Sequence, residues 1–259
     1  MQTAAVDTQL LETKVKAMYR RVAQDPQGDF HFEMGRAMAE RLGYPGRDLD
    51  HVPAESIASF AGVGYHFDLA GLTTGERVLD LGSGSGLDTF IASLAVGSEG
   101  RVVGIDMTDA QLEKSRQLAD DGGFRNVTYD KSYIEQLPCD DASFDCIISN
   151  GVVNLSADKT ATFAEAARVL RPGGRIALSD IVTREQLPEG IVCDATLWAA
   201  CIGGAMQREA YQQAIEAAGL RITCMKVNDG YRFLSDNATG AEKKYGVQSI
   251  SLVAIKSNA

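Results

Sequence analysis

Three glycines at alternate positions, Gly82, Gly84 and Gly86, separate one short apolar run from another that begins at Leu87. Glycine lets the backbone adopt conformations that other residues avoid, and it lets a ligand approach the main chain closely. A helix that follows such a turn presents unpaired N–H groups, and these favour negative groups such as a carboxylate. The spacing differs from the Gly-x-Gly-x-x-Gly of a dinucleotide-binding loop. The stretch is therefore predicted to be a ligand-binding turn between a strand and a helix.

Two carboxylates accompany this turn. Asp80 lies two residues ahead of Gly82, and Asp106 ends a second apolar run at 101–106. An acid about 20 residues beyond the glycine turn of a β–α–β unit can accept hydrogen bonds from the hydroxyls of a ribose. Ligands of such sheets bind at the carboxyl ends of the strands, so the two acids and the turn are expected on one rim. The predicted ligand contains a nucleoside.

Strands and helices alternate from Gly75 onward, which predicts an α/β fold with a mostly parallel sheet. Strands are expected at 78–81, 101–106, 127–129, 144–149, 175–179, 220–227 and 247–255, and helices at 87–96, 109–121, 158–169, 194–204 and 207–218. Residues 1–70 are expected to form a helical cap, with helices at 8–24 and after Asp29, and residues 71–259 the ligand-binding domain. The stretch from Asn228 to Gly246 is interpreted as a hairpin or a lid.

The composition limits the partners. The 259 residues carry a formal net charge of −10 without a run rich in Lys and Arg, which argues against nucleic acid. Residues 1–12 lack the basic start and apolar core of a secretory signal, and no apolar run is long enough to span a bilayer. Five cysteines without closely paired spacing are typical of a reducing cytosol. We expect a cytoplasmic protein with no membrane or nucleic-acid partner.

Residues 78–86 together with Asp106 resemble the cofactor half of the class I S-adenosylmethionine-dependent methyltransferases. In that family the acid of the first strand and the glycine loop hold the methionine part of the cofactor, and the acid of the second strand holds the ribose. Further segments between residues 60 and 206 resemble the arsenite methyltransferase group. They are residues 104–108, 134–135, 148–150, 153–159, 168–174 and 197–201.

The resemblance implies a Rossmann-like sheet of seven strands, S-adenosyl-L-methionine as the cofactor and a small-molecule acceptor. It implies that Met107 packs on the adenosine, that Ile134 lies beside the adenine and that Asn150 lines the cofactor site. For the long apolar residues, ordinary core packing stays open as an alternative. The cofactor-binding residues that it implies are Asp80, Gly82, Ser83, Gly84, Gly86, Asp106, Met107, Ile134, Glu135 and Asn150.

The arsenite enzymes of this group bind trivalent arsenic through cysteine thiolates, because a soft thiolate suits a soft centre. This chain has Val63 and Gly151 at two of the three usual positions, and only Cys201 matches the third. The departure leaves methyl transfer intact but leaves the acceptor open. It is either a trivalent arsenical or another soft metalloid or thiol, or a small molecule that is methylated on oxygen, nitrogen or carbon.

Methyl transfer from a sulfonium is a direct displacement, and orientation lowers its barrier without a covalent nucleophile. A phenol, hydroxyl or ammonium acceptor would need a general base. The candidate catalytic residues are His66, His31 and Cys201, and the acceptor pocket is expected to include Tyr19, Tyr65, Gly151 and Trp198. Each of these side chains also has an alternative role in packing. The few scattered histidines and the absence of a Cys-x-x-Cys pair predict no metal site.

Two other functional classes remain open. A nicotinamide-dependent oxidoreductase has the same kind of sheet but is disfavoured by the glycine spacing. A non-catalytic protein would bind S-adenosylmethionine and turn over nothing, and the well-formed glycine turn with both acids does not distinguish it from an enzyme.

Overall fold

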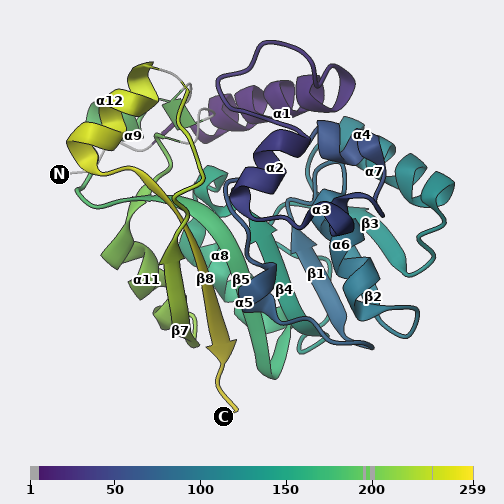
Figure 1. Cartoon of the computed structure of the whole chain (residues 1–259). Helices are drawn as coiled ribbons and strands as arrows, with labels where there is room; N and C mark the ends of the chain where they lie inside the picture. The colour runs from purple at the N-terminus through teal and green to yellow at the C-terminus, as the bar shows by residue number, and fades with distance from the viewer. Residues whose placement is uncertain (1–5, 195–196, 199–201, 235, 259) are drawn as a thin grey trace.

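The computed structural model describes residues 6–194, 197–198, 202–234 and 236–258. Its centre is one twisted sheet in which the strand order is β3-β2-β1-β4-β5-β8-β7, with β6 beside β5 (Figure 1). The strands are β1 (Arg77–Leu81), β2 (Arg101–Asp106), β3 (Val127–Lys131), β4 (Phe144–Asn150), β5 (Leu170–Thr183), β6 (Met206–Gln207), β7 (Leu220–Val227) and β8 (Gln248–Lys256). Only β8 runs antiparallel to its neighbours β5 and β7. The expected α/β sheet with seven main strands is confirmed, and the two-residue β6 is added to it.

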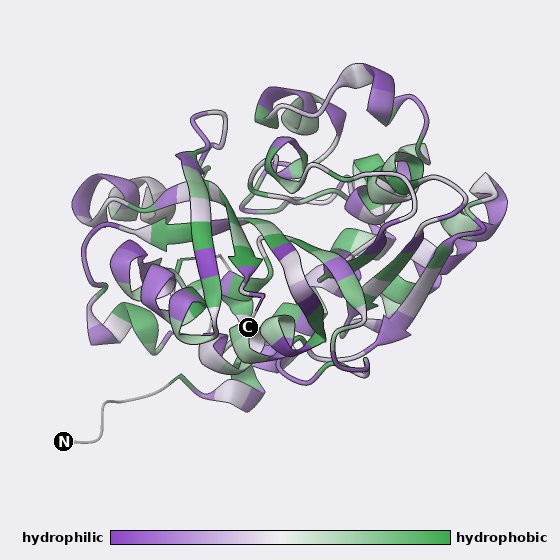
Figure 2. Cartoon of the chain, turned by 90° about the horizontal axis from the view of Figure 1, so that it is seen from below, coloured by the Kyte–Doolittle hydropathy of each residue, from purple (hydrophilic) through white to green (hydrophobic). Residues whose placement is uncertain are grey.

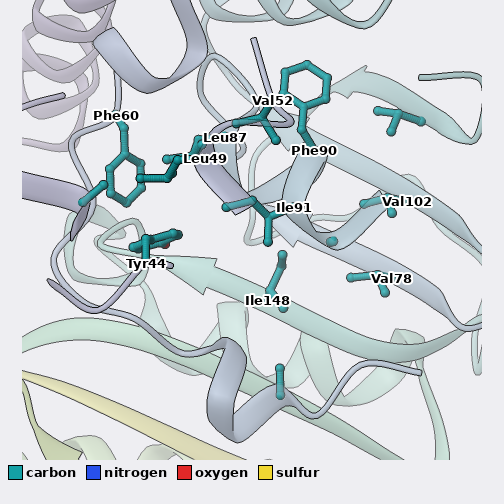
Figure 3. Packing of buried hydrophobic residues seen from close by; sticks show 14 of the residues in the cluster. Tyr44, Leu49, Val52, Phe60, Val78, Leu87, Phe90, Ile91, Val102 and Ile148 are labelled. Carbon is teal, nitrogen blue, oxygen red and sulfur yellow. The ribbon is translucent and has the colours of Figure 1, made fainter. Parts of the chain in front are cut away.

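Helices cover both faces of the sheet because successive strand residues point to opposite sides. On one face Ile148 of β4 packs with the helix α6 (Leu87–Val96) through Phe90 and Ile91 (Figure 3). On the other face Ile147 packs with α8 (Lys159–Val169) through Phe163. The remaining elements of this half are α7 (Asp109–Gly122), the 3-10 turn η1 (Val153–Leu155), α9 (Glu189–Val192), α11 (Arg208–Ala217) and α12 (Asp236–Tyr245). In Figure 2 the helices mix hydrophobic and hydrophilic residues, as expected of helices with one buried face.

The first 70 residues supply five helices of the described chain: α1 (Thr8–Gln24), α2 (Arg36–Leu42), α3 (Gly46–Leu49), α4 (Ala54–Ala58) and α5 (Phe67–Ala70). Figure 1 shows α1 lying across the end of the sheet to which β1 and β4 point. Tyr44 and Leu49 share one buried cluster with Val78 and Phe90. The helical segment therefore packs into the same core as the sheet.

Two expectations about local structure differ from the structure. The helix expected after Asp29 begins only at Arg36, because Phe30 and Phe32 stack on each other with their ring centroids 5.6 Å apart and Gly35 turns the chain at φ +88°. The stretch from Asn228 to Gly246 contains a helix, α12, instead of a hairpin. Of the helix expected at 194–204, residues 195–196 and 199–201 lie outside the described residues. None of the described helices combines the length and apolar character of a membrane span.

The helix α1 is capped by Asp7, whose Oδ1 accepts hydrogen bonds from the backbone N–H groups of Gln9 and Leu10 at 3.1 and 3.0 Å. We expect Asp7→Ala to lower the free energy of unfolding by about 1 kcal/mol, because two N–H groups lose their acceptor. Asp7→Ser, which keeps a side-chain acceptor, is expected to lose much less. Urea unfolding of the three proteins measures this, and equal losses for both variants would contradict a capping role.

Candidate active site

A cavity of about 480 Å³ lies at the carboxyl ends of β1, β2 and β4, beneath α1. Its floor is formed by the residues that follow each strand, and its cover by α1 and the segment after α4. The lining residues are Thr8, Leu11, Glu12, Val15, Tyr19, Ser56, Ser59, Phe60, Ala61, Gly62, Asp80, Gly82, Ser83, Gly84, Ser85, Leu87, Asp88, Asp106, Met107, Thr108, Gln111, Ser132, Tyr133, Ile134, Glu135, Gln136, Asn150, Gly151, Val152, Leu155, Ser156 and Ala157.

The glycine turn follows β1 and needs its glycines for two different reasons. Gly82, Gly84 and Gly86 all have positive φ, at +72°, +52° and +95°, where L-residues with side chains are strained. A Cβ atom at Gly82 would also lie 2.6 Å from Val152, whereas a Cβ at Gly84 would meet nothing closer than 3.9 Å. Gly82 and Gly84 line the cavity. Gly86 does not, because it faces the rings of Phe90 and Tyr129.

Two buried carboxylates lie beside this turn. Asp80 accepts a hydrogen bond from Thr89 Oγ1 at 2.6 Å. Asp88, in the first turn of α6, accepts from Tyr44 Oη at 2.6 Å and from Asn150 Nδ2 at 3.0 Å. Burial raises the pKa of Asp80 well above its usual range, and repulsion from Asp88 adds to the rise. Burial raises the pKa of Asp88 to about 6, against the opposing effect of its two hydrogen bonds.

Asp106 ends β2 and is fixed by backbone N–H groups. Its Oδ2 accepts from Gly84 N at 3.0 Å and its Oδ1 from Thr108 N at 2.8 Å. Each carboxylate oxygen has a second lone pair, so both can still accept hydrogen bonds from a ligand. Burial raises the pKa of Asp106.

Asn150 ends β4 and joins the sheet to the helical segment. Its Oδ1 accepts from Val63 N at 2.8 Å and Gly64 N at 3.3 Å. Its Nδ2 lies 3.0 Å from each of three acceptors, Tyr44 Oη, Gly64 O and Asp88 Oδ2. These contacts occupy the whole amide of Asn150. Its main role at the cavity is therefore to hold the segment around Val63 and Gly64 against the sheet.

The other wall comes from the segment after β3 and from α1. Glu135 Oε1 accepts from Ser156 Oγ at 2.5 Å. Tyr133 Oη donates to Glu12 Oε1 of α1 at 2.5 Å, and Lys16 Nζ lies 2.9 Å from the same hydroxyl. Gln111 of α7 also holds α1, because its Nε2 donates to Tyr19 O at 3.0 Å. The wall and α1 together enclose the cavity.

The expected site residues divide into two groups. Those that line the cavity are Asp80, Gly82, Ser83, Gly84, Asp106, Met107, Ile134, Glu135, Asn150, Tyr19 and Gly151. Gly86, Tyr65, Trp198, His31 and His66 are not among the lining residues, and Cys201 lies outside the described residues. The sequence interpretation missed Asp88, Gln111, Tyr133 and the α1 residues Leu11, Glu12 and Val15. Of these, Asp88 could have been found from the sequence, because it is an acid in the first turn of the helix that follows the glycines.

The candidate bases are placed away from the cavity. His66 is fully buried and its ring stacks on Phe67 with the centroids 4.7 Å apart. Burial lowers the pKa of His66 to about 3, so the imidazole is neutral at physiological pH. His31 packs edge-on against Phe32. These positions run against a role for either histidine as the general base.

Two of the other expected pocket residues belong to neighbouring clusters. Tyr65 packs against Tyr44 with the ring centroids 4.9 Å apart. Trp198 is buried behind α1 with Leu11 and Val15. Both therefore support the residues that form the cavity without reaching it.

The ionisable groups of the cavity have one sign. Its carboxyl groups are Glu12, Asp80, Asp88, Asp106 and Glu135, and no Lys, Arg or His belongs to the described lining. A search of the described residues finds no group of three or more His, Cys, Asp or Glu that would suit a metal ion. The cavity therefore favours a positively charged ligand and disfavours an anionic one.

Val63 and Gly151 are neighbours at the edge of the cavity. Val63 is buried, and a Cβ atom at Gly151 would lie 3.3 Å from Val63 Cγ1. The described cysteines, Cys139, Cys146, Cys193 and Cys224, do not line the cavity. Within the described residues this part of the wall is apolar and carries no thiol.

Comparison with known proteins gives a consistent family. A family model described as a methyltransferase domain matches residues 72–219. The arsenite methyltransferase of Halobacterium salinarum is 36% identical over 199 residues, which are 76% of this chain and 51% of that protein. The arsenite methyltransferase of Homo sapiens is 44% identical over 138 residues, 50% of this chain and 37% of that protein. The chain thus spans about half the length of these relatives, or less.

A solved structure agrees with the sequence comparison. The crystal structure of an arsenic(III) S-adenosylmethionine methyltransferase from Chlamydomonas reinhardtii matches with a TM-score of 0.68 and 32% sequence identity. The match covers 87% of this chain and 74% of the other.

Proposed function

Because the chain belongs to the class I S-adenosylmethionine-dependent methyltransferases, near their arsenite methyltransferases, we propose that it transfers a methyl group from S-adenosylmethionine to a small acceptor with an available lone pair. The carboxylate lining of the cavity carries this proposal. S-adenosylmethionine has a net positive charge from its sulfonium and ammonium groups, whereas a nicotinamide dinucleotide has an anionic pyrophosphate. An anion-rich cavity without a described basic residue attracts the former and repels the latter.

The described residues fit the cofactor. Asp106 has free lone pairs for the ribose hydroxyls, as the second-strand acid of the family does. Gly82 and Gly84 line the cavity, and the open space beside Gly84 leaves the main chain accessible to the methionine part. Of the buried pair Asp80 and Asp88, Asp88 with its pKa of about 6 offers negative charge to the ammonium group at neutral pH, and Asp80 offers hydrogen-bonding oxygens beside it. Met107 and Ile134 supply apolar surface for the adenosine.

When bound, the cofactor supplies an electrophilic methyl carbon on sulfur. The chain has to orient the acceptor in line with the methyl–sulfur bond and to keep water out. Leu11 and Val15 of α1 cover the cavity with apolar side chains, and Phe60 and Leu155 extend this surface. This lining favours an uncharged acceptor of modest size.

The acceptor is proposed to be a thiol or a trivalent arsenical carried on small thiols. An arsenical, or a thiol that has lost its proton to solvent and enters as the thiolate, has a lone pair that needs no general base, and the described lining has no histidine or lysine to act as one. Val63 and Gly151 supply no thiolate, so an arsenical would depend on its own thiols and on Cys201. Methylation of a phenol or an amine is the alternative that the assay has to distinguish.

Calorimetric titration with S-adenosylmethionine, followed by product detection, tests the proposal. We expect binding, and methylated product from arsenite with glutathione or from a small thiol. Loss of arsenic methylation in Cys201→Ser, with Cys193→Ser unaffected, would assign Cys201 to the arsenical. Binding of a nicotinamide dinucleotide in place of S-adenosylmethionine would contradict the proposal. Cofactor binding with turnover of phenols or amines alone would contradict the proposed acceptor.

The pH dependence of cofactor binding follows from Asp88. Its raised pKa of about 6 means that it loses its negative charge as the pH falls through that value. Affinity for the cationic cofactor is therefore expected to be full above pH 7 and to weaken by up to about tenfold for each pH unit below 6. Calorimetry between pH 5 and 8 measures this. Asp88→Asn should bind more weakly at pH 8 and lose the dependence, and an affinity of the wild type that stays constant down to pH 5 would contradict it.

A further inference from the structure

Lys159, the first residue of α8, is a lysine that is only 5% exposed. It does not belong to the lining of the cavity. Its Nζ donates hydrogen bonds to Asn154 O at 3.1 Å and Ser156 O at 2.9 Å. The same atom lies 4.8 Å from the centroid of the Trp198 ring. An ammonium group is costly to bury, and the positive end of the helix dipole disfavours it further. Such a placement needs compensation from the surroundings.

Two carboxylates from other elements supply this compensation. Asp180 of β5 is fully buried, and it accepts from Tyr211 Oη of α11 and from Ile181 N, both at 2.8 Å. Glu135 lies in the cavity wall. Burial lowers the pKa of Lys159 to about 8, while the charges of Asp180 and Glu135 act to raise it. Burial raises the pKa of Asp180 to about 6 against the effect of Lys159. The buried Lys159 and Asp180 and the half-buried Glu135 therefore form one cluster of groups with opposite charge types.

This cluster is connected to the cavity through Ser156. The carbonyl of Ser156 is held by Lys159, and its hydroxyl donates to Glu135 Oε1 at 2.5 Å. Thr162 Oγ1 and Asp158 N also lie 3.1 Å from that hydroxyl oxygen. Leu155, Ser156 and Ala157 line the cavity, and so does Glu135. The position of this wall therefore depends on where Lys159 holds the turn.

We propose that Lys159 is a positioning residue whose buried ammonium, through its hydrogen bonds to the carbonyls of Asn154 and Ser156, fixes the turn 154–157 and thereby the Glu135 side of the cofactor cavity. That the cavity binds the cofactor rests on the proposed function. That Lys159 carries a buried ammonium group does not depend on it. Because hydrogen bonds of Lys159 reach only carbonyls behind the wall, its effect on the ligand passes through Ser156 and Glu135.

The chain contains its own probe of Lys159, because Trp198 is its single tryptophan. We expect the Trp198 fluorescence of the wild type to change as the pH rises through about 8, when the ammonium over the ring loses its charge. The ionisable groups that face Lys159 from the packed elements are Glu135, Asp180 and Tyr211. Asp180, with a pKa of about 6, titrates below that range, and burial raises the pKa of Tyr211 well above its usual value. Lys159→Arg and Lys159→Met should show no such transition, and Lys131→Met, which removes an exposed lysine, should keep it.

Cofactor binding supplies the second readout. The amino group of S-adenosylmethionine titrates in the same range, so the quantity to compare is the ratio of dissociation constants of wild type and Lys159→Arg, measured by calorimetry from pH 6.5 to 9.5. The ratio is expected to be constant below pH 7.5 and to rise by up to about tenfold per pH unit above 8, because a guanidinium keeps its charge. Lys159→Met should bind at least tenfold more weakly than wild type at pH 7.

The outcomes separate the two claims. A fluorescence transition in a wild type that does not bind S-adenosylmethionine would overturn the proposed function and leave the buried ammonium in place. Wild-type affinity in Lys159→Met, at an unfolding midpoint that shows a folded protein, would overturn the positioning role. A transition of Trp198 that persists in both Lys159 variants would overturn the assignment of the buried charge.

Discussion

Asp106→Ala is expected to weaken binding of S-adenosylmethionine by about a hundredfold or more. The reason is that the variant loses the acceptors proposed for two ribose hydroxyls, and a hydrogen bond to a charged group contributes about 1.5–3 kcal/mol. The variant also leaves Gly84 N and Thr108 N without their acceptor, which loosens the glycine turn. Calorimetric titration at pH 7.5 measures the change.

Asp109→Ala is the matched control, because Asp109 lies three residues further on with an exposed carboxylate that pairs with Lys131. Its affinity should stay within twofold of wild type. Asp106→Asn keeps one acceptor oxygen, so its affinity for S-adenosylmethionine should lie between those of Asp106→Ala and Asp109→Ala. If Asp106→Ala binds the cofactor as tightly as Asp109→Ala, the ribose is held elsewhere.

Gly82→Ala is expected to lower the free energy of unfolding by about 2–5 kcal/mol. The substitution adds the strain of a side chain at positive φ, about 1–2 kcal/mol, to an overlap with Val152 that costs about 1–3 kcal/mol. Gly84→Ala has the same kind of backbone strain but an open space for the Cβ atom, so it should lose only about 1–2 kcal/mol. Urea unfolding of the unliganded proteins separates the two contributions.

The double variant Gly82→Ala with Val152→Ala tests the cause of the larger loss. The alanine at 152 removes Cγ2 and Cγ1, which would lie 2.6 and 2.9 Å from the added Cβ atom, but keeps Cβ at 2.6 Å, so it should restore only part of the stability. If Gly82→Ala lowers the free energy of unfolding no more than Gly84→Ala does, the side chain of Val152 can move away from the added Cβ atom at no cost, and the proposed overlap is contradicted.

The sheet could be predicted from the sequence because its signals are local. Apolar runs of strand length alternate with helical patterns, and acids or glycines mark the strand ends. For the same reason Asp80, Gly82, Gly84 and Asp106, which are all within a few residues of β1 and β2, were found at the cavity. Local patterns of this kind locate the carboxyl ends of the strands, but they do not show which segments cover that end of the sheet.

The cover of the cavity could not be predicted in detail, because it depends on contacts between distant segments. Tyr133 meets Glu12 across 121 positions of the chain, and Gln111 meets Tyr19 across 92. The positions of the candidate histidines outside the cavity lining could not be predicted for a related reason. His66 follows a glycine-rich segment, and the sequence does not show that Asn150 and the strand β8 draw this segment into the core.

In the proposed reaction, transfer of the methyl group abolishes the sulfonium charge, so the product S-adenosylhomocysteine would carry one positive charge fewer than the cofactor. Beside a carboxylate such as Asp88, that loss removes an attraction once the reaction is complete. Product departure then becomes easier while fresh cofactor is still drawn in. S-adenosylhomocysteine should accordingly be a weak inhibitor of the turnover that produces it.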